Sequence, residues 1–106
     1  MPTYKVLAQS APTAATATTL YTATNATIVS TLNASNIGGT QDTIRVAVRP
    51  AGATLASQHY IAYGVPLAAG AILSLQGGIT LANTDVITVY STTGNTSFSA
   101  FGSEGN

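Results

Sequence analysis

The sequence has no cysteine and few charged residues. Three basic and three acidic residues make up 6 % of the 106 positions, against about 25 % in a typical soluble protein. Without cysteine the chain can form no disulfide, zinc–thiolate site or thiol nucleophile. Its formal net charge of zero leaves it without the several positive charges that binding to a nucleic-acid backbone requires. We therefore expect no nucleic-acid partner.

Long apolar runs are also absent. No segment approaches the roughly 18 apolar residues of a membrane-spanning helix. The opening stretch MPTYKVLAQS lacks the apolar core of a signal peptide. We expect synthesis in a cytoplasm and no association with membranes.

Catalytic and metal-binding patterns are scarce. The single histidine, His59, would have to be the base of any Ser-His-Asp triad, but no G-x-S-x-G turn presents a nucleophile. No calcium loop, zinc ligand set or phosphate-binding glycine loop occurs. Asp42 and Asp85 stand where loops lead into expected strands and are predicted to bond the local backbone. We expect no enzymatic activity, no cofactor and no metal, and we place His59 at the surface or in an interface.

What the chain does contain is strand-forming residues broken at regular intervals by turn residues. Thr, Val, Ile and Tyr are plentiful, whereas the helix formers Lys, Glu and Arg are almost absent. The segments that favour strands are 3–9, 18–24, 26–35, 42–50, 59–65, 71–75, 84–91 and 96–102, and Gly, Asn and Pro lie between them. The pattern predicts one all-β domain over residues 1–106. It is a β-sandwich of about eight short antiparallel strands, either jelly-roll or immunoglobulin-like.

The two ends of the chain are expected to be less regular. Residues 1–17 are predicted to form an extended N-terminal arm, in which only 3–9 alternates weakly as a strand would. Residues 102–106, GSEGN, are predicted to form a flexible tail. Gly77 and Gly78 are expected to form a turn after the strand at 71–75.

The clearest alternation runs through TIRVAVRPAG, residues 43–52, which holds two of the three basic residues. Ile44, Val46 and Val48 are expected to face the core, and Arg45 and Arg49 the opposite side. One hypothesis makes the arginines an anion or glycan site. The other pairs them, within the subunit or across an interface, with the acids Asp42, Asp85 or Glu104.

We favour the pairing hypothesis, because three bases match three acids and arginine is common at protein interfaces. The predicted interface residues are Arg45, Arg49, His59 and Tyr60. A carbohydrate-binding module is the alternative from another class, since Tyr60, Tyr63 and Tyr90 could stack on sugar rings. Tyrosines in sandwiches, however, more often pack in cores or interfaces.

The surface must be covered mainly by small neutral groups. Thr and Ala occur 18 times each, and Ser and Asn are also common. Such a surface loses its water at low cost, because no ion has to be desolvated. This favours a subunit of an assembly over a freely diffusing enzyme.

Residues 44–104 carry four elements in order: R-P-A-G at the end of a strand, then H-Y-I-A-Y, GITLANTDVITVY and SFSAFGSE. This stretch is similar to a group of small virion proteins encoded by tailed bacteriophages, including cyanophages. The shared elements are strand and turn patterns, and none is a catalytic motif. The resemblance implies a β-sandwich in a virus particle.

Within that resemblance we expect a capsid cement or decoration subunit that binds and stabilises the assembled capsid. Its partners would be the major capsid protein or another virion protein, and further copies of itself, with a trimer favoured. A tail, baseplate or fibre-associated subunit is the alternative. The chain shows no heptad pattern, repeat or long shaft, which a fibre would tend to show.

Overall fold

The computed structural model describes residues 3–105 and confirms an all-β protein. Its strands are β1 (Thr3–Ser10), β2 (Thr18–Thr22), β3 (Thr27–Asn36), β4 (Asp42–Arg49), β5 (Tyr60–Leu67), β6 (Ile72–Leu81), β7 (Val86–Ser91) and β8 (Thr96–Glu104). Two short 3₁₀ turns, η1 (Pro50–Gly52) and η2 (Ser57–His59), lie between β4 and β5. Over the described residues, no helix is long and apolar enough to cross a membrane.

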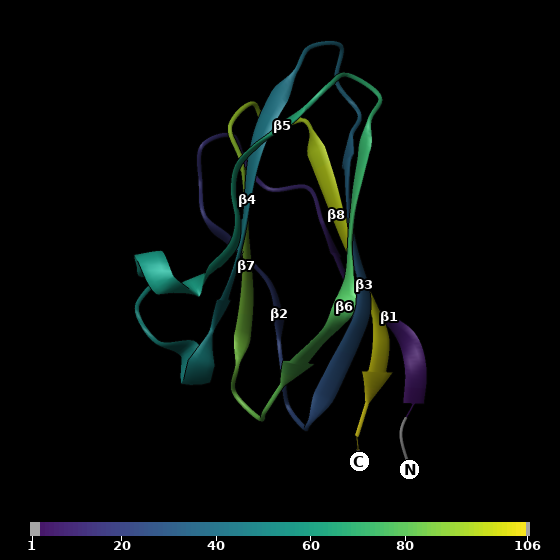
Figure 1. Ribbon diagram of the computed structural model, residues 1–106, viewed down its shortest axis with the longest axis vertical. Helices are drawn as coiled ribbons and strands as arrows, with labels where there is room; N and C mark the ends of the chain where they lie inside the picture. The colour runs from purple at the N-terminus through teal and green to yellow at the C-terminus, as the bar shows by residue number, and fades with distance from the viewer. Residues whose placement is uncertain (1–2, 106) are drawn as a thin grey trace.

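The strands form two antiparallel sheets that pack face to face (Figure 1). Sheet A has the order β1-β8-β3-β6 and sheet B the order β2-β7-β4-β5. Every connection crosses from one sheet to the other except β4 to β5. This is the jelly-roll arrangement, so the jelly roll is the one of the two expected sandwiches that the chain adopts.

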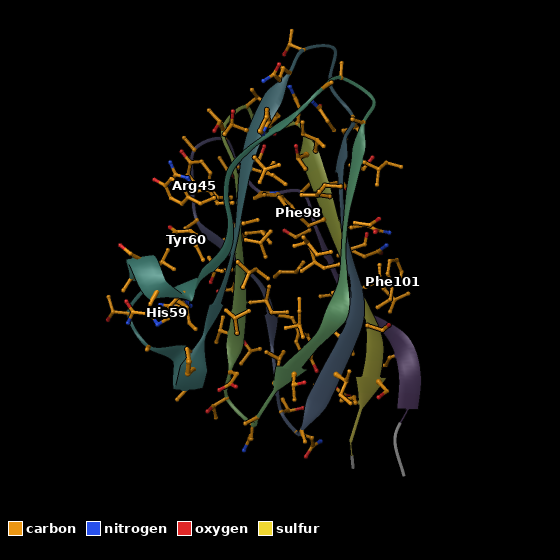
Figure 2. The ribbon with its side chains drawn as sticks, in the orientation of Figure 1. Arg45, His59, Tyr60, Phe98 and Phe101 are labelled. Carbon is orange, nitrogen blue, oxygen red and sulfur yellow. The ribbon has the colours of Figure 1, made fainter. Side chains whose placement is uncertain are left out.

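The core lies between the sheets and is built from alternate residues of the strands. Leu32 of β3, Ile44 of β4, Ile87 of β7 and Phe98 of β8 are completely buried. Phe98 projects into the space between the sheets, as Figure 2 shows. The predicted inward face of β4 is confirmed, because Ile44 and Val46 are buried and Val48 packs against the core.

Both ends of the chain are more regular than expected. Residues 3–10 form β1, which pairs along β8 from Thr3 opposite Glu104 to Ser10 opposite Phe98. Only 11–17 of the predicted arm is an irregular connection. The predicted tail is wrong for 102–105, since β8 continues to Glu104 and the amide of Gly105 donates to Ala26 O at 2.8 Å. Positions 1, 2 and 106 lie outside the described residues.

The predicted turn at Gly77 and Gly78 is also wrong. Both glycines lie inside β6, which pairs with β3 from Ile72 to Leu81. The register shifts between Val29 and Thr31 of β3, and Gly78 has a φ of +70°. The glycines therefore allow a local irregularity within β6, and the chain does not reverse its direction there.

Candidate functional site

Arg45 is held between two tyrosine rings on the outer face of sheet B. In the register of the sheet it stands opposite Tyr63 of β5 on one side and Tyr90 of β7 on the other. Its guanidinium carbon lies 4.5 Å from the centroid of the Tyr63 ring and 4.2 Å from that of Tyr90. Contact with two aromatic rings stabilises the cation and restricts the movement of the guanidinium.

Tyr60 joins this group because β5 is irregular. The register with β4 shifts twice, near Ile61 and near Gly64, whose φ of +66° favours glycine. Tyr60 and Tyr63 therefore share the outer face, and their rings meet edge to face with centroids 4.8 Å apart. Strict alternation along residues 59–65 would put Tyr63 on the face opposite to Tyr60, and the two register shifts prevent this. We call Arg45, Tyr60, Tyr63 and Tyr90 the arginine–tyrosine cluster.

An open hollow of about 650 Å³ adjoins the cluster. It is lined by the rings of Tyr60 and Tyr63 and by the segment that leads into η2, namely Leu55, Ala56 and Ser57. Tyr63 is 62 % exposed. The hollow is thus bordered by aromatic rings and neutral polar groups, with the arginine beside it.

Arg49 and His59 do not lie on an open surface. Their side chains form hydrogen bonds that hold the loop over residues 50–59 in place. Arg49 donates from Nε to Thr88 Oγ1 and from its terminal nitrogen to Ala53 O, each at 3.1 Å. His59 is only 8 % exposed, and its Nδ1 accepts the amide of Ala56 at 3.0 Å. Figure 2 shows Arg45, Tyr60 and His59 on the same side of sheet B. The expected surface position of His59 is wrong, because this loop folds over it.

The pairing of arginines with acids inside the subunit is wrong as well. Glu104 Oε1 pairs with Lys5 Nζ at 3.0 Å, and Glu104 also accepts the Tyr21 hydroxyl. Asp85 accepts the amides of Ala51 at 2.8 Å and Ala82 at 2.9 Å. Among the described residues, neither arginine forms an ion pair.

Asp42 is buried at the other end of the sandwich from Glu104. It accepts hydrogen bonds from the hydroxyls of Ser91 and Thr96 and from the amides of Thr43 and Thr93. Burial alone would raise the pKa of Asp42, but these four donors outweigh it and lower the pKa to about 2. The predicted bond from Asp42 to its local backbone is confirmed by the Thr43 amide. The two hydroxyl partners come from β7 and β8, so the carboxylate also joins the two sheets.

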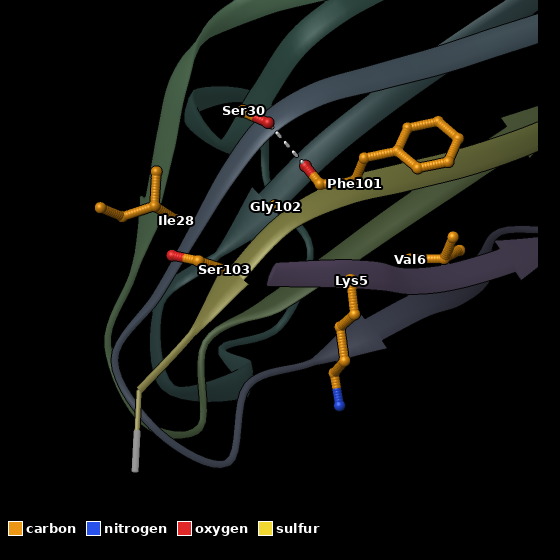
Figure 3. Close-up of a pocket in the computed structure, with 7 residues that line it drawn as sticks. All are labelled: Lys5, Val6, Ile28, Ser30, Phe101, Gly102 and Ser103. Atoms are coloured by element: carbon orange, nitrogen blue, oxygen red, sulfur yellow. Dashed lines mark hydrogen bonds between the residues drawn. The ribbon is translucent and has the colours of Figure 1, made fainter. Parts of the chain in front are cut away.

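A second feature, which was not predicted from the sequence, is an apolar depression on the outer face of sheet A (Figure 3). It has a volume of about 670 Å³ and contains side chains of β1, β3 and β8. Val6 and Ile28 are each half exposed, and Phe101 stands between their strands. The lining residues are Lys5, Val6, Ile28, Ser30, Phe101, Gly102 and Ser103. The available signal was the odd spacing of Phe98 and Phe101, which puts them on opposite faces of one strand.

The rest of this face carries small neutral groups and one large exposed apolar side chain, Ile72 of β6. Phe98 and Ala100 point inward, so the serines between and beside them, Ser97 and Ser99, point outward. On the neighbouring strands Ser74 Oγ donates to Asn33 Oδ1 at 2.7 Å. Among the described residues, sheet A has only Lys5 and Glu104 as charged side chains, and these pair with each other near one end.

No protein-family model, curated protein or solved structure matches this chain. The similarity to phage virion proteins therefore stays a prediction, and the function has to be argued from the two outer faces. Across the described residues, no three His, Cys, Asp or Glu side chains lie together in a group that could hold a metal ion.

Proposed function

We propose that this protein is a non-enzymatic structural protein of a bacteriophage virion. In this proposal it is a capsid cement or decoration subunit, and it binds the assembled capsid through the outer face of sheet A. The observation that carries the proposal is the nature of that face. It is an apolar depression with half-exposed Val6 and Ile28, bordered by neutral hydroxyl and amide groups and by the Lys5–Glu104 pair.

Such a face suits a lasting protein contact. The apolar side chains of Val6, Ile28 and Phe101 gain free energy when a partner covers them, about 1.5–3 kcal/mol for each side chain that is fully buried. The serines and Asn33 around them can keep hydrogen bonds across an interface, and the charged groups at the border, Lys5 and Glu104, already pair with each other. The face is therefore suited to remain covered by protein.

Two further considerations support the proposal without deciding it. The jelly roll is an architecture that viral capsid proteins and lectins share, which is an analogy at the level of the fold. The sequence resemblance covers β4 to β8, and these strands include most of sheet B and half of sheet A. We further propose a homo-oligomer, with a trimer favoured, which sedimentation equilibrium of the purified chain would measure.

The test is cosedimentation of the protein with capsids that lack it, from the phage that encodes the sequence. The double variant Ile28→Ser, Phe101→Ser removes the apolar groups of the depression and should weaken capsid binding about 100-fold, since it forfeits two buried side chains. Ile37→Ser is the matched control, because Ile37 is 72 % exposed but lies outside sheet A. Thermal unfolding of each variant checks that the fold survives.

Capsids with bound protein should also resist heat better than capsids without it. Equal binding of the double variant and the wild type would contradict the proposed face. Immunogold label confined to tails would overturn the capsid location and favour the tail, baseplate or fibre-associated alternative.

A further inference from the structure

We propose that the arginine–tyrosine cluster and its hollow bind a carboxylate-bearing saccharide, such as a uronic-acid unit. The carboxylate would accept hydrogen bonds from Arg45, and the sugar ring would pack against the tyrosines that line the hollow. This site is on the outer face of sheet B, opposite the face proposed for capsid binding. Neither proposal depends on the other.

The geometry of Arg45 favours a carboxylate. The rings of Tyr63 and Tyr90 both have their centroids within 4.5 Å of its guanidinium carbon, and its N–H groups are what it can offer to a ligand. No hydrogen bond from these groups to another described residue occurs, and none of them is both buried and unpaired. A guanidinium held close to two rings can donate two parallel hydrogen bonds to one carboxylate with little loss of conformational freedom.

The charges around the cluster leave Arg45 without an internal partner. Each of the three acids is engaged elsewhere: Glu104 with Lys5, Asp85 with the backbone of two loops, and Asp42 inside the sandwich. Arg49, the other cation of this sheet, already donates to Thr88 and Ala53. One unengaged cation matches a ligand with a single negative charge per unit, whereas a nucleic acid would need several.

The hollow suits the neutral part of a sugar. Its aromatic side is formed by Tyr60 and Tyr63, and the C–H groups of a pyranose ring pack well on aromatic rings. Its other side is the Leu55–Ser57 segment, whose hydroxyl and backbone groups can bond sugar hydroxyls. A volume of about 650 Å³ falls in the range of small-molecule sites, and apolar lining with a few polar groups is typical of them.

An acidic peptide would share the charge but fits the neighbouring strand poorly. β5 is an edge strand of sheet B and the one next to the cluster, a position where an extended peptide could add as another strand. Two register shifts and the bulge at Gly64 break the row of backbone groups there, and Pro66 has no amide to donate. A ligand would therefore be bound by the side chains of the cluster and not by the backbone of β5, and these side chains favour a ring-shaped ligand.

The test is isothermal titration of the full chain with a tetramer of galacturonic acid and with its fully methyl-esterified form. The acid form should bind, and the ester at least about tenfold more weakly, because the charge-assisted hydrogen bonds to Arg45 are lost. Arg45→Gln and Tyr63→Ala should each weaken binding by about tenfold or more. Lys5→Gln removes the same charge on the other sheet and should leave the affinity for the tetramer unchanged.

Three results would overturn the inference. The first is equal binding of acid and ester, and the second is equal weakening by Arg45→Gln and Lys5→Gln. The third is binding of hexaglutamate as tightly as the tetramer, which would assign the cluster to an acidic protein partner. Thermal unfolding of Arg45→Gln and Tyr63→Ala shows whether either variant is misfolded, and Tyr63→Phe, which keeps the ring, should then retain binding.

Discussion

Two carboxylates join the sheets of the sandwich at opposite ends, and they do so in different surroundings. Asp42 of β4 in sheet B accepts the hydroxyl of Thr96 from sheet A, and Glu104 of β8 in sheet A accepts the hydroxyl of Tyr21 from sheet B. Asp42 is 1 % exposed, whereas the side chain of Glu104 is 20 % exposed and lies at the end where β1 begins and β8 ends (Figure 1).

The difference between the two ends shows that burial determines how much a carboxylate–hydroxyl hydrogen bond contributes to the free energy of unfolding. No water can take the place of the Asp42 carboxylate beside its donors, so loss of the carboxylate would leave buried hydroxyls unpaired. The partners of Glu104 can turn to solvent, and the attraction between Glu104 and Lys5 is screened by salt. We expect the Asp42 end to hold the sandwich together more strongly than the Glu104 end.

The largest effect should come from Asp42→Asn. The amide keeps one acceptor oxygen but turns an NH₂ group toward donors, so at least one of the Ser91 and Thr96 hydroxyls loses its partner. We expect a loss of about 3–5 kcal/mol in the free energy of unfolding, measured by urea denaturation. Asp85→Asn, which changes the same residue type in a partly exposed turn, should cost much less. Equal costs would remove the distinction that burial makes.

At the Glu104 end, close strand packing should matter more than the carboxylate. A Cβ atom added at Gly102 would collide with the carbonyl oxygen of Ile28 on the paired strand β3. Gly102→Ala should therefore force the strands apart and cost up to about 3 kcal/mol in urea denaturation. Gly39→Ala is the control, because nothing lies near an added Cβ there. A neutral Gly102→Ala would show that β3 and β8 can separate freely at this end.

Acid should weaken the Asp42 end. The pKa of Asp42 is about 2 in the folded chain and 3.8 ordinarily, because its hydrogen-bond donors outweigh the effect of burial. A lowered pKa stabilises the fold fully above about pH 4, and this contribution is lost as the pH falls toward 2. The loss is about 2 kcal/mol. It is measured as the difference between the pH–stability curves of the wild type and Asp42→Asn, and parallel curves would contradict it.

The smallest effect should come from Glu104→Gln. Hydrogen bonds from Tyr21, and then from Lys5, lower the pKa of Glu104, yet both partners stay accessible to water. We expect less than half the loss seen for Asp42→Asn, and a loss that shrinks as salt is added. Thermal unfolding at low and high salt measures it. Tyr21→Phe, which leaves the pair with Lys5 intact, should show no such dependence on salt.

Much of the fold was predictable because strand signals are local. All eight expected strands occur, with bounds moved by a few residues except in β6, which runs on to Leu81 through two glycines. The choice between jelly roll and immunoglobulin-like sandwich was not predictable, since it depends on which distant strands become neighbours. The faces of β5 do not follow simple alternation, because bulges at Ile61 and Gly64 interrupt it.

The candidate sites were predictable only in part, for the same reason. The outward face of Arg45 followed from alternation in β4, and the structure confirms it. Its position between Tyr63 and Tyr90 depends on the register of three strands that are separate in sequence. The burial of His59 depends on how the loop over residues 50–59 folds, and no local pattern encodes that. The depression on sheet A likewise combines three strands.

The irregular edge of β5 has a consequence for the behaviour of the protein in concentrated solution. A chain with a net charge of zero has almost no electrostatic repulsion to keep its copies apart. An even edge strand would then invite sheets of different copies to join and grow into aggregates. The bulges and Pro66 make that edge a poor template. At this edge, backbone shape opposes the association that surface charge prevents in most proteins, and we expect a variant with a regular β5 to lose solubility before stability.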